Sequence, residues 1–217
     1  DTHRHILTGN AESKFGISLD VAHELRKHDW KNLDLCGVHF HIGSQIPDPT
    51  SISATLDIVL GFLEACPPSW DTLDMGGGFP VGYENERVVN SFADFAKVAA
   101  NRLARFPRPL NLIIEPGRSL IADTGALLLT VQASKETGAY QTVIVDGGMN
   151  TLLRPALYDA HHHVLPLQET NKDTYPTHLA GPVCESTDYL ARDRQLPELS
   201  RNDKLAVMTT GAYGYSM

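Results

Sequence analysis

The sequence has little cysteine and no long apolar segment. Its three cysteines, Cys36, Cys66 and Cys184, are an odd number at irregular spacing in 217 residues, which argues against a disulfide scaffold and for a reducing compartment. No stretch approaches the roughly 18–20 apolar residues that span a bilayer, and the first residues do not form a charged segment followed by an apolar one. We therefore expect a soluble, cytoplasmic protein with no membrane partner.

The sequence also lacks a cluster of basic residues. It has 18 Lys and Arg against 26 Asp and Glu, a formal net charge of −8. Nucleic-acid binding depends mainly on basic side chains that neutralise phosphates, so this balance disfavours a nucleic-acid partner. The 42% of hydrophobic residues is enough to build a core and argues against a disordered chain.

Apolar residues in the first half alternate between strand and helix periodicity. Residues 35–41, 72–75 and 110–114 are predicted strands, and the third is so apolar that we expect it to be covered on both faces. Helical spacing predicts helices over 52–63 and 92–106, the second capped by Ser91. A further helix is expected around 21–28 and a strand near 5–8. Strands that alternate with helices pair in parallel, as in barrels and doubly wound sheets.

After about Ile121 the pattern changes to short strands. The segments 127–132, 142–145 and 204–208 are strand candidates, separated by turns that contain Gly or Pro rather than by long helices. The sequence therefore predicts an α/β domain over residues 1–121 and a β-rich domain over residues 122–217.

Each of the three predicted parallel strands is followed by residues suited to chemistry, and the carboxyl ends of parallel strands meet on one face. The segments are His41-Ile42-Gly43-Ser44, Gly76-Gly77-Gly78 and Glu115-Pro116-Gly117-Arg118. Glycines let backbone N–H groups approach an anion, and Ser44 and Arg118 add a hydroxyl and a guanidinium, so a phosphate group fits this set. Taken singly, the motifs also have ordinary interpretations: a tight turn for the glycines, an ion pair with Arg118 for Glu115, and a hydrogen-bonded structural histidine for His41.

Histidines offer a second interpretation. His39 and His41 are two residues apart and hence on the same face of one strand, as in barrel-type metallohydrolases. A further run covers residues 161–163, but no Asp, Glu or Cys lies near it at a spacing typical of metal ligands. The glycine triplet favours a phosphate, so we assign no metal ligand. A metallohydrolase that uses His39 and His41 stays the alternative from a different class.

Seven motifs occur in order along the chain. They are GVHFHIGSQ (37–45), DMGGGF (74–79), EPGRS (115–119), VDGGMN (145–150), RPALY (154–158), CESTD (184–188) and GAYGYSM (211–217). With them the chain resembles the fold-type III pyridoxal-phosphate-dependent decarboxylases over essentially its whole length, and among these the members that act on diaminopimelate. The resemblance implies part of an alanine-racemase-like TIM (β/α) barrel followed by a β-rich C-terminal domain that completes the active site.

The resemblance implies pyridoxal 5'-phosphate as the cofactor. His41 would stack on its ring. Glu115 would pair with the pyridine nitrogen and keep it protonated, so that the ring withdraws electrons. The other implied cofactor-binding residues, around the phosphate, are Ser44, Gly76, Gly77, Gly78, Gly117, Arg118 and Tyr213.

The resemblance also implies the substrate, meso-2,6-diaminopimelate, which would be decarboxylated to L-lysine through an aldimine. Arg118, Arg154 and Tyr158 would face its distal carboxylate, and Glu185 its distal ammonium group. Tyr213 would contact the substrate as well as the phosphate.

The implied catalytic residues are Cys184, Glu115 and His41. Cys184 would protonate the α-carbon after carbon dioxide departs, whereas Cys36 is expected to pack in the core. Cys184 and Glu185 would enter the active site of a second subunit, which implies a homodimer.

The chain departs from the family pattern at the Schiff-base lysine. The family carries this lysine near its N-terminus in a motif of the type Tyr-Ala-x-Lys-Ala-Asn, and none of the seven lysines has that context; they are Lys14, Lys27, Lys31, Lys97, Lys135, Lys172 and Lys204. We expect a fragment that lacks the lysine segment and the extreme C-terminus and is inactive alone.

Alternatives within the same fold are decarboxylases of ornithine, arginine or carboxynorspermidine. Arg154 and Tyr158 favour a substrate with a distal carboxylate, which ornithine lacks. A non-catalytic remnant that acts by pairing with another subunit is a further alternative.

Overall fold

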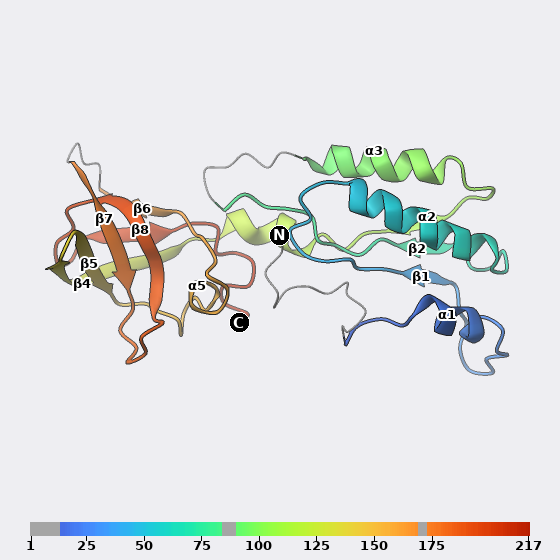
Figure 1. Ribbon diagram of the computed structural model, residues 1–217, viewed down its shortest axis with the longest axis horizontal. Coiled ribbons are helices and arrows are strands. Elements are labelled where there is room, and N and C mark those ends of the chain that lie inside the picture. Colours follow the sequence, from blue (N-terminus) through green and yellow to red (C-terminus); the bar gives the residue numbers. More distant parts are fainter. Residues whose placement is uncertain (1–13, 84–89, 169–172) are drawn as a thin grey trace. The chain divides into compact units, whose positions relative to one another are not determined.

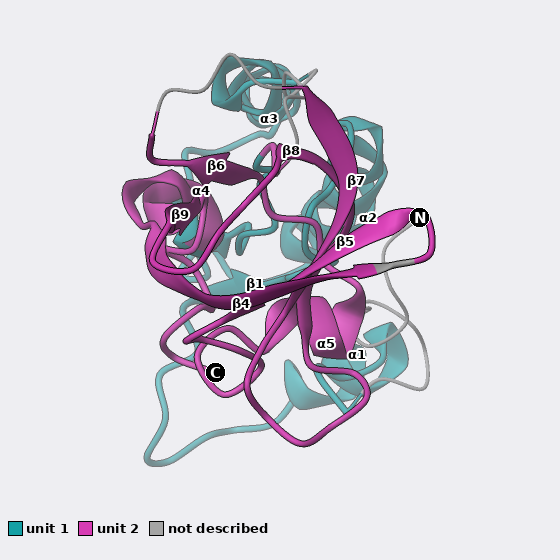
Figure 2. Cartoon of the chain, turned by 90° about the vertical axis from the view of Figure 1, so that its left-hand side faces the viewer, with its two compact units in different colours: residues 1–81, 88–117 teal, residues 82–87, 118–217 magenta. Residues whose placement is uncertain are grey.

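The computed structural model describes residues 14–83, 90–168 and 173–217, and the strand expected near residues 5–8 lies outside them. The chain divides into two compact units (Figure 2): unit 1 comprises residues 1–81 and 88–117, and unit 2 comprises residues 82–87 and 118–217. Unit 1 combines helices with a parallel sheet, and unit 2 is built mainly of strands. The predicted order, an α/β part followed by a β-rich part, is confirmed.

Unit 1 is built on a parallel sheet of three short strands in the order β1 (Gly37–His39), β2 (Thr72–Asp74) and β3 (Asn111–Ile113). The register pairs His39 with Asp74, and Asp74 with Ile113. All three predicted strands are present, each shorter than the predicted range. Their common direction places the residues that follow them at one edge of the sheet.

Two helices of unit 1, α2 (Thr50–Glu64) and α3 (Phe92–Leu103), run side by side (Figure 1). α2 turns Ile52, Leu56 and Leu63 into the core at helical spacing. The start of α3 is fixed as predicted, because the Ser91 backbone N–H and hydroxyl donate to Asp94 Oδ2 at 2.7 and 2.8 Å. The helix expected around 21–28 is the short α1 (Leu19–Leu25).

Unit 2 contains a six-stranded sheet in the order β6-β9-β4-β5-β7-β8. The strands are β4 (Leu127–Thr137), β5 (Tyr140–Val145), β6 (Val164–Pro166), β7 (Thr174–Ala180), β8 (Tyr189–Pro197) and β9 (Lys204–Val207). All neighbours are antiparallel except β5 and β7. The long β4 pairs with β9 through its first residues and with β5 through its later ones, which gathers Val131, Val143 and Leu205 into one core.

Helices in unit 2 are short. They are α4 (Gly117–Ile121), which begins in unit 1, the 3₁₀ turn η1 (Ala122–Thr124) and α5 (Arg154–Tyr158). Strands β4, β5 and β9 were predicted from the sequence, whereas β6, β7, β8 and α5 were not. The motif at residues 154–158 thus forms a short helix.

Two expectations about burial are wrong. Residues 112–114, expected to be covered on both faces, are 44–47% exposed, and in the described part of the chain β3 is an edge strand of its sheet. Cys36, expected in the core, is exposed just ahead of β1, and the buried cysteine is Cys66. The Cys66 thiol donates to the carbonyl of Phe62, and burial raises its pKa. Across residues 14–83, 90–168 and 173–217 no helix combines the length and apolarity that crossing a membrane needs.

The core of unit 1 provides a stability test on α2. Leu56 is fully buried and Ile58, two residues along the same helix, is 59% exposed. We expect Leu56→Ala to lower the free energy of unfolding by about 2–5 kcal/mol through lost burial and a residual cavity. Ile58→Ala should change it by less than about 0.5 kcal/mol. Urea unfolding followed by circular dichroism measures both, and equal effects would contradict the assigned helix face.

Candidate functional site

The three motifs of unit 1 meet at the carboxyl edge of its sheet. The backbone N–H of Glu115 donates to Gly76 O at 2.7 Å, and the backbone N–H of Gly77 donates to His41 Nδ1 at 3.2 Å. These contacts join the residues that follow β1, β2 and β3. The prediction that the motifs are neighbours is confirmed for His41, the glycine triplet and Glu115.

The glycine triplet allows this close approach. A Cβ on Gly77 would lie 2.2 Å from Glu115 O, and one on Gly78 would lie 2.3 Å from Gly43 O. Gly76 and Gly78 also have positive φ angles, 62° and 92°, which disfavour other residues. Side chains are therefore excluded here by neighbouring backbone.

The amides of the triplet are not equally available to an anion. Gly76 N–H donates to Asp74 Oδ1 at 2.9 Å, and Gly77 N–H donates to the His41 ring. The Gly78 N–H has no acceptor among the described residues. An anion contact from the triplet thus falls to Gly78, a narrower role than the sequence suggested.

Glu115 has an imidazole partner that was not assigned from the sequence. Its Oε2 lies 3.3 Å from His39 Nε2, and both side chains are about half exposed. Together with Asp74, their potential ligand atoms lie within 4.8 Å of one another, and among the described residues this is the one such group. His41 is not part of it, so the His39 and His41 pair of the alternative metal interpretation does not converge on one metal position.

Two arginines in unit 2 are held by aromatic rings. Arg118 Nη1 donates to the Tyr83 hydroxyl at 2.7 Å, and its guanidinium lies 4.7 Å from the centre of the Tyr213 ring. The Arg154 guanidinium lies 4.4 Å from the centre of the Tyr83 ring. Tyr83 was missed from the sequence, because its position between the arginines depends on tertiary structure.

Arg154 is a buried cation. It is 7% exposed, and burial lowers its pKa, although a guanidinium stays protonated in proteins. Among the described residues no carboxylate lies within ion-pair distance of it. A buried charge of this kind is stabilised by an anion, and a ligand carboxylate would supply one.

His162 contacts the Arg154 side chain directly. Its Nε2 lies 2.7 Å from Arg154 Nη1 and its Nδ1 lies 2.9 Å from Met208 O, and the residue is fully buried. Burial lowers the pKa of His162 to about 4, and the neighbouring charges of Arg154, His161 and Arg118 act in the same direction. The histidine is therefore neutral at pH 7.

The loop that carries Cys184 and Glu185 is fixed by Asp188. Asp188 is 3% exposed, and its two oxygens accept from Met149 N at 2.6 Å and from Val183 N at 2.7 Å. Gly148 and Gly181 pack against this carboxylate, where a Cβ would lie 2.5 and 2.3 Å from its oxygens. One buried charge thus joins the loop after β5 to the loop after β7.

The remaining predicted residues of unit 2 lie on accessible segments. Cys184 is exposed and its thiol is free. Glu185 is also exposed and accepts from the Ser186 hydroxyl at 3.1 Å. Tyr158 ends α5, four residues after Arg154, and is half-buried.

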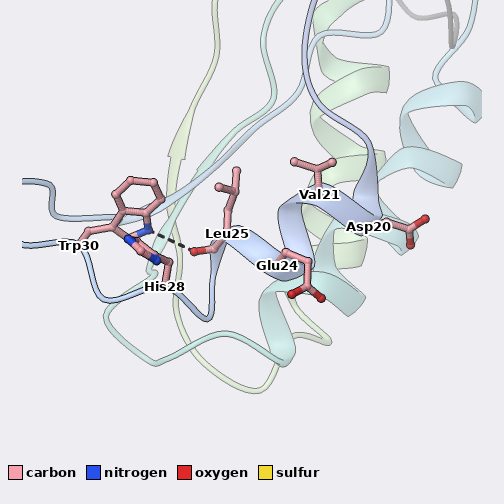
Figure 3. Close-up of a pocket in the computed structure, with 6 residues that line it drawn as sticks. All are labelled: Asp20, Val21, Glu24, Leu25, His28 and Trp30. Atoms are coloured by element: carbon pink, nitrogen blue, oxygen red, sulfur yellow. Dashed lines mark hydrogen bonds between the residues drawn. The ribbon is translucent and has the colours of Figure 1, made fainter.

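An open depression of about 410 Å³ lies on α1 and the turn that follows it (Figure 3). It is lined by Asp20, Val21, Glu24, Leu25, His28 and Trp30. Trp30 Nε1 donates to Leu25 O at 3.1 Å and thereby closes the turn. None of the motif residues lines this depression, so it is separate from the candidate site.

The fold and the site define a class of protein: a parallel α/β unit whose strand ends carry an imidazole, a carboxylate and a glycine turn, joined to a β-rich unit with buried arginine. The family model for pyridoxal-dependent decarboxylases, described as their C-terminal sheet domain, matches residues 19–211. The chain belongs to this family.

Named relatives agree with this assignment. Diaminopimelate decarboxylase of Helicobacter pylori (strain J99) is 40% identical over 222 residues, covering 100% of this chain and 54% of the relative. The crystal structure of the H. pylori enzyme complexed with L-lysine matches with a TM-score of 0.88 at 38% identity, again over 100% and 54% of the two chains. A lysine/ornithine decarboxylase from Vibrio vulnificus complexed with cadaverine matches with a TM-score of 0.85 at 26% identity, over 96% and 58%. The chain thus spans about half the length of these relatives.

The buried histidine makes stability depend on pH. The pKa of His162 is about 4 when folded and about 6.5 when unfolded, so between these values the unfolded state binds more protons. We expect the free energy of unfolding to fall as the pH drops from about 6.5 to 4, by up to about 3 kcal/mol. Urea unfolding of the protein at several pH values measures how its free energy of unfolding depends on pH. A His162→Gln variant should lose that part of the slope, and an unchanged slope would contradict the assignment.

The Asp188 contacts predict a second effect. In Asp188→Asn one oxygen becomes an NH2 group that faces a backbone N–H, so the free energy of unfolding should fall by about 1–3 kcal/mol. The loop should also loosen, which would change the rate of Cys184 alkylation in a Cys36→Ser background. Asp193→Asn, on an exposed side chain of β8, is the matched control and should alter neither quantity. No difference between the two variants would refute the role assigned to Asp188.

Proposed function

We propose that the full-length protein decarboxylates meso-2,6-diaminopimelate to L-lysine with pyridoxal 5'-phosphate as its cofactor. The observation that carries this proposal is the buried Arg154 guanidinium, which lies against a tyrosine ring and a neutral histidine and has no carboxylate partner among the described residues. A substrate with a distal carboxylate would supply that partner. The relatives named diaminopimelate decarboxylase support the same substrate.

The residues of unit 1 fit the cofactor. Glu115 presents a half-exposed carboxylate that can hold the proton of a pyridine nitrogen. The His41 ring is oriented by the Gly77 amide, which suits a stacking contact. Gly78 has positive φ, no room for a side chain and an amide without an acceptor among the described residues, and these properties suit a phosphate oxygen. When bound, pyridoxal phosphate supplies a ring that withdraws the electrons left when carbon dioxide departs.

We assign the anion-binding residues of this chain as follows. Ser44, Gly78, Gly117, Arg118 and Tyr213 bind the cofactor phosphate, and Gly76 and Gly77 hold the strand ends together around it. Arg154 binds the distal carboxylate of the substrate, with Arg118 and Tyr158, and Glu185 binds its distal ammonium group. Tyr213 contacts the substrate as well.

Cys184 donates the proton that replaces the lost carboxyl group at the α-carbon. Its exposure and its place on a loop fixed by a buried carboxylate support this role. We also propose that the protein is a homodimer in which this loop, with Cys184 and Glu185, serves the site of the other subunit. The exposure of residues 182–187 is consistent with such a contact.

A second candidate is a decarboxylase of lysine or ornithine, because a structure of a lysine/ornithine decarboxylase matches 96% of this chain at 26% identity. Such substrates have no distal carboxylate. The two candidates therefore differ in the role of Arg154, and this difference can be measured.

The test uses the full-length protein loaded with pyridoxal phosphate. We expect carbon dioxide and L-lysine from meso-diaminopimelate, and slower release from L-ornithine, L-lysine, L-arginine and carboxynorspermidine. Arg154→Gln should lower kcat/KM for meso-diaminopimelate by about 30-fold or more, since a buried charge loses its partner at a cost of roughly 2–5 kcal/mol.

Arg192→Gln is the matched control, because Arg192 is an exposed arginine of the same unit that lies over the Tyr189 ring. It should leave kcat/KM within about twofold, as exposed substitutions usually do. Equal turnover of meso-diaminopimelate by the Arg154 variant, or preferred turnover of ornithine, would exclude the proposal.

A further inference from the structure

The histidine run 161–163 has no part in the proposed chemistry, yet its members differ in their surroundings. His161 Nδ1 lies 3.3 Å from Tyr83 O, and the backbone carbonyl of His163 accepts from Met208 N at 2.8 Å. Of the three, His162 is fully buried, and its Nε2 contacts the Arg154 guanidinium. His162 is therefore the buried member of the run and lies in direct contact with Arg154.

The partners of His162 determine which nitrogen carries its proton. Met208 O, 2.9 Å from Nδ1, accepts and cannot donate, so Nδ1 must be protonated. Arg154 Nη1, 2.7 Å from Nε2, donates and cannot accept, so Nε2 must present its lone pair. The two contacts together require a neutral ring in the Nδ1–H form.

The Arg154 guanidinium is held on two sides by uncharged groups. His162 accepts one of its N–H bonds, and the Tyr83 ring lies against it at 4.4 Å. The same Tyr83 ring meets the His162 ring edge to face at 5.2 Å and receives a hydrogen bond from Arg118 on its hydroxyl. A neutral acceptor orients a guanidinium and leaves its charge available. A carboxylate in the same place would neutralise that charge and compete with a ligand carboxylate.

We propose that His162, in the Nδ1–H form, is the positioning residue that holds Arg154 for the distal carboxylate of the substrate without neutralising the guanidinium. This inference rests on the proposed function, because that function gives Arg154 its ligand. It makes substrate selectivity depend on a residue that does not touch the substrate.

Two substitutions separate the two ring contacts. In His162→Gln the amide reaches the place of Nε2, so an acceptor for Arg154 is kept and the bond to Met208 is lost. In His162→Asn the amide stays near the place of Nδ1, so the bond to Met208 is kept and the acceptor for Arg154 is lost. His163→Asn, at the neighbouring position, is the matched control.

The kinetic measurement compares these variants in the full-length holoenzyme. His162→Asn should raise KM for meso-diaminopimelate about 10- to 100-fold, the effect of losing a hydrogen bond to a charged group, while kcat changes by less than about threefold. His162→Gln should restore KM to within about threefold of the unsubstituted enzyme, and His163→Asn should leave it unchanged. Equal KM values for the Gln and Asn variants would overturn the proposal.

A spectroscopic measurement tests the contact without any turnover and in the unsubstituted protein. Nitrogen-15 NMR of the His162 ring should show a protonated Nδ1 and an unprotonated Nε2, with no titration between pH 5.5 and 8. Separate Arg154 Nη signals should persist in His162→Gln and merge in His162→Asn as guanidinium rotation becomes free. An Nε2–H ring, or titration near pH 6.5, would overturn the positioning role.

The two readouts distinguish the two proposals. If the NMR signature is found and meso-diaminopimelate is not a substrate, the proposed function fails while the contact between His162 and Arg154 stands. If meso-diaminopimelate is turned over and the signature is absent, the proposed function stands and the role of His162 fails.

Discussion

The close approach of three backbones at the carboxyl ends of β1, β2 and β3 is the constraint on which the rest of unit 1 depends. A side chain on Gly76, Gly77 or Gly78 would overlap backbone of the neighbouring segments. Because the three segments touch, the Gly77 amide can orient the His41 ring and the Gly76 carbonyl can bind the Glu115 amide. The glycines therefore allow the three segments to pack closely, and of the three Gly78 is the one whose amide has no acceptor in the described part of the chain.

Unit 2 uses buried charge in two opposite ways. Asp188 accepts hydrogen bonds from two backbone amides through its two carboxylate oxygens and so fixes a loop, which is a structural use of the charge. Arg154 is held by a neutral imidazole and an aromatic ring, which orient it and leave its charge uncompensated among the described residues. The first arrangement gives rigidity beside Cys184 and Glu185. The second gives a cation that favours an anionic ligand.

The sequence identified most of the motif residues, since strand ends, glycine runs and ordered motifs are local features. It did not identify the partners that give these residues their roles. These partners lie more than thirty residues apart in the sequence. The pairs are His39 with Glu115, Tyr83 with Arg154, and Asp188 with the Met149 amide. Spacing alone allowed His39 and His41 to bind one metal ion. In the structure the His39 ring contacts Glu115, whereas the His41 ring accepts from the Gly77 amide.

By itself the sequence determined the alternation of strand and helix in the first half, the cap at Ser91 and the family, because each depends on short-range pattern or motif order. Tertiary structure alone decided the rest. It placed β6, β7 and β8, whose apolar pattern is weak; β6 and β7 pair with the distant β9 and β5, and β8 pairs with β7. It left residues 112–114 exposed, since burial depends on neighbours that a strand cannot specify. It also selected one histidine from a run of three, because only packing distinguishes a buried ring between a carbonyl and a guanidinium from its half-buried neighbours.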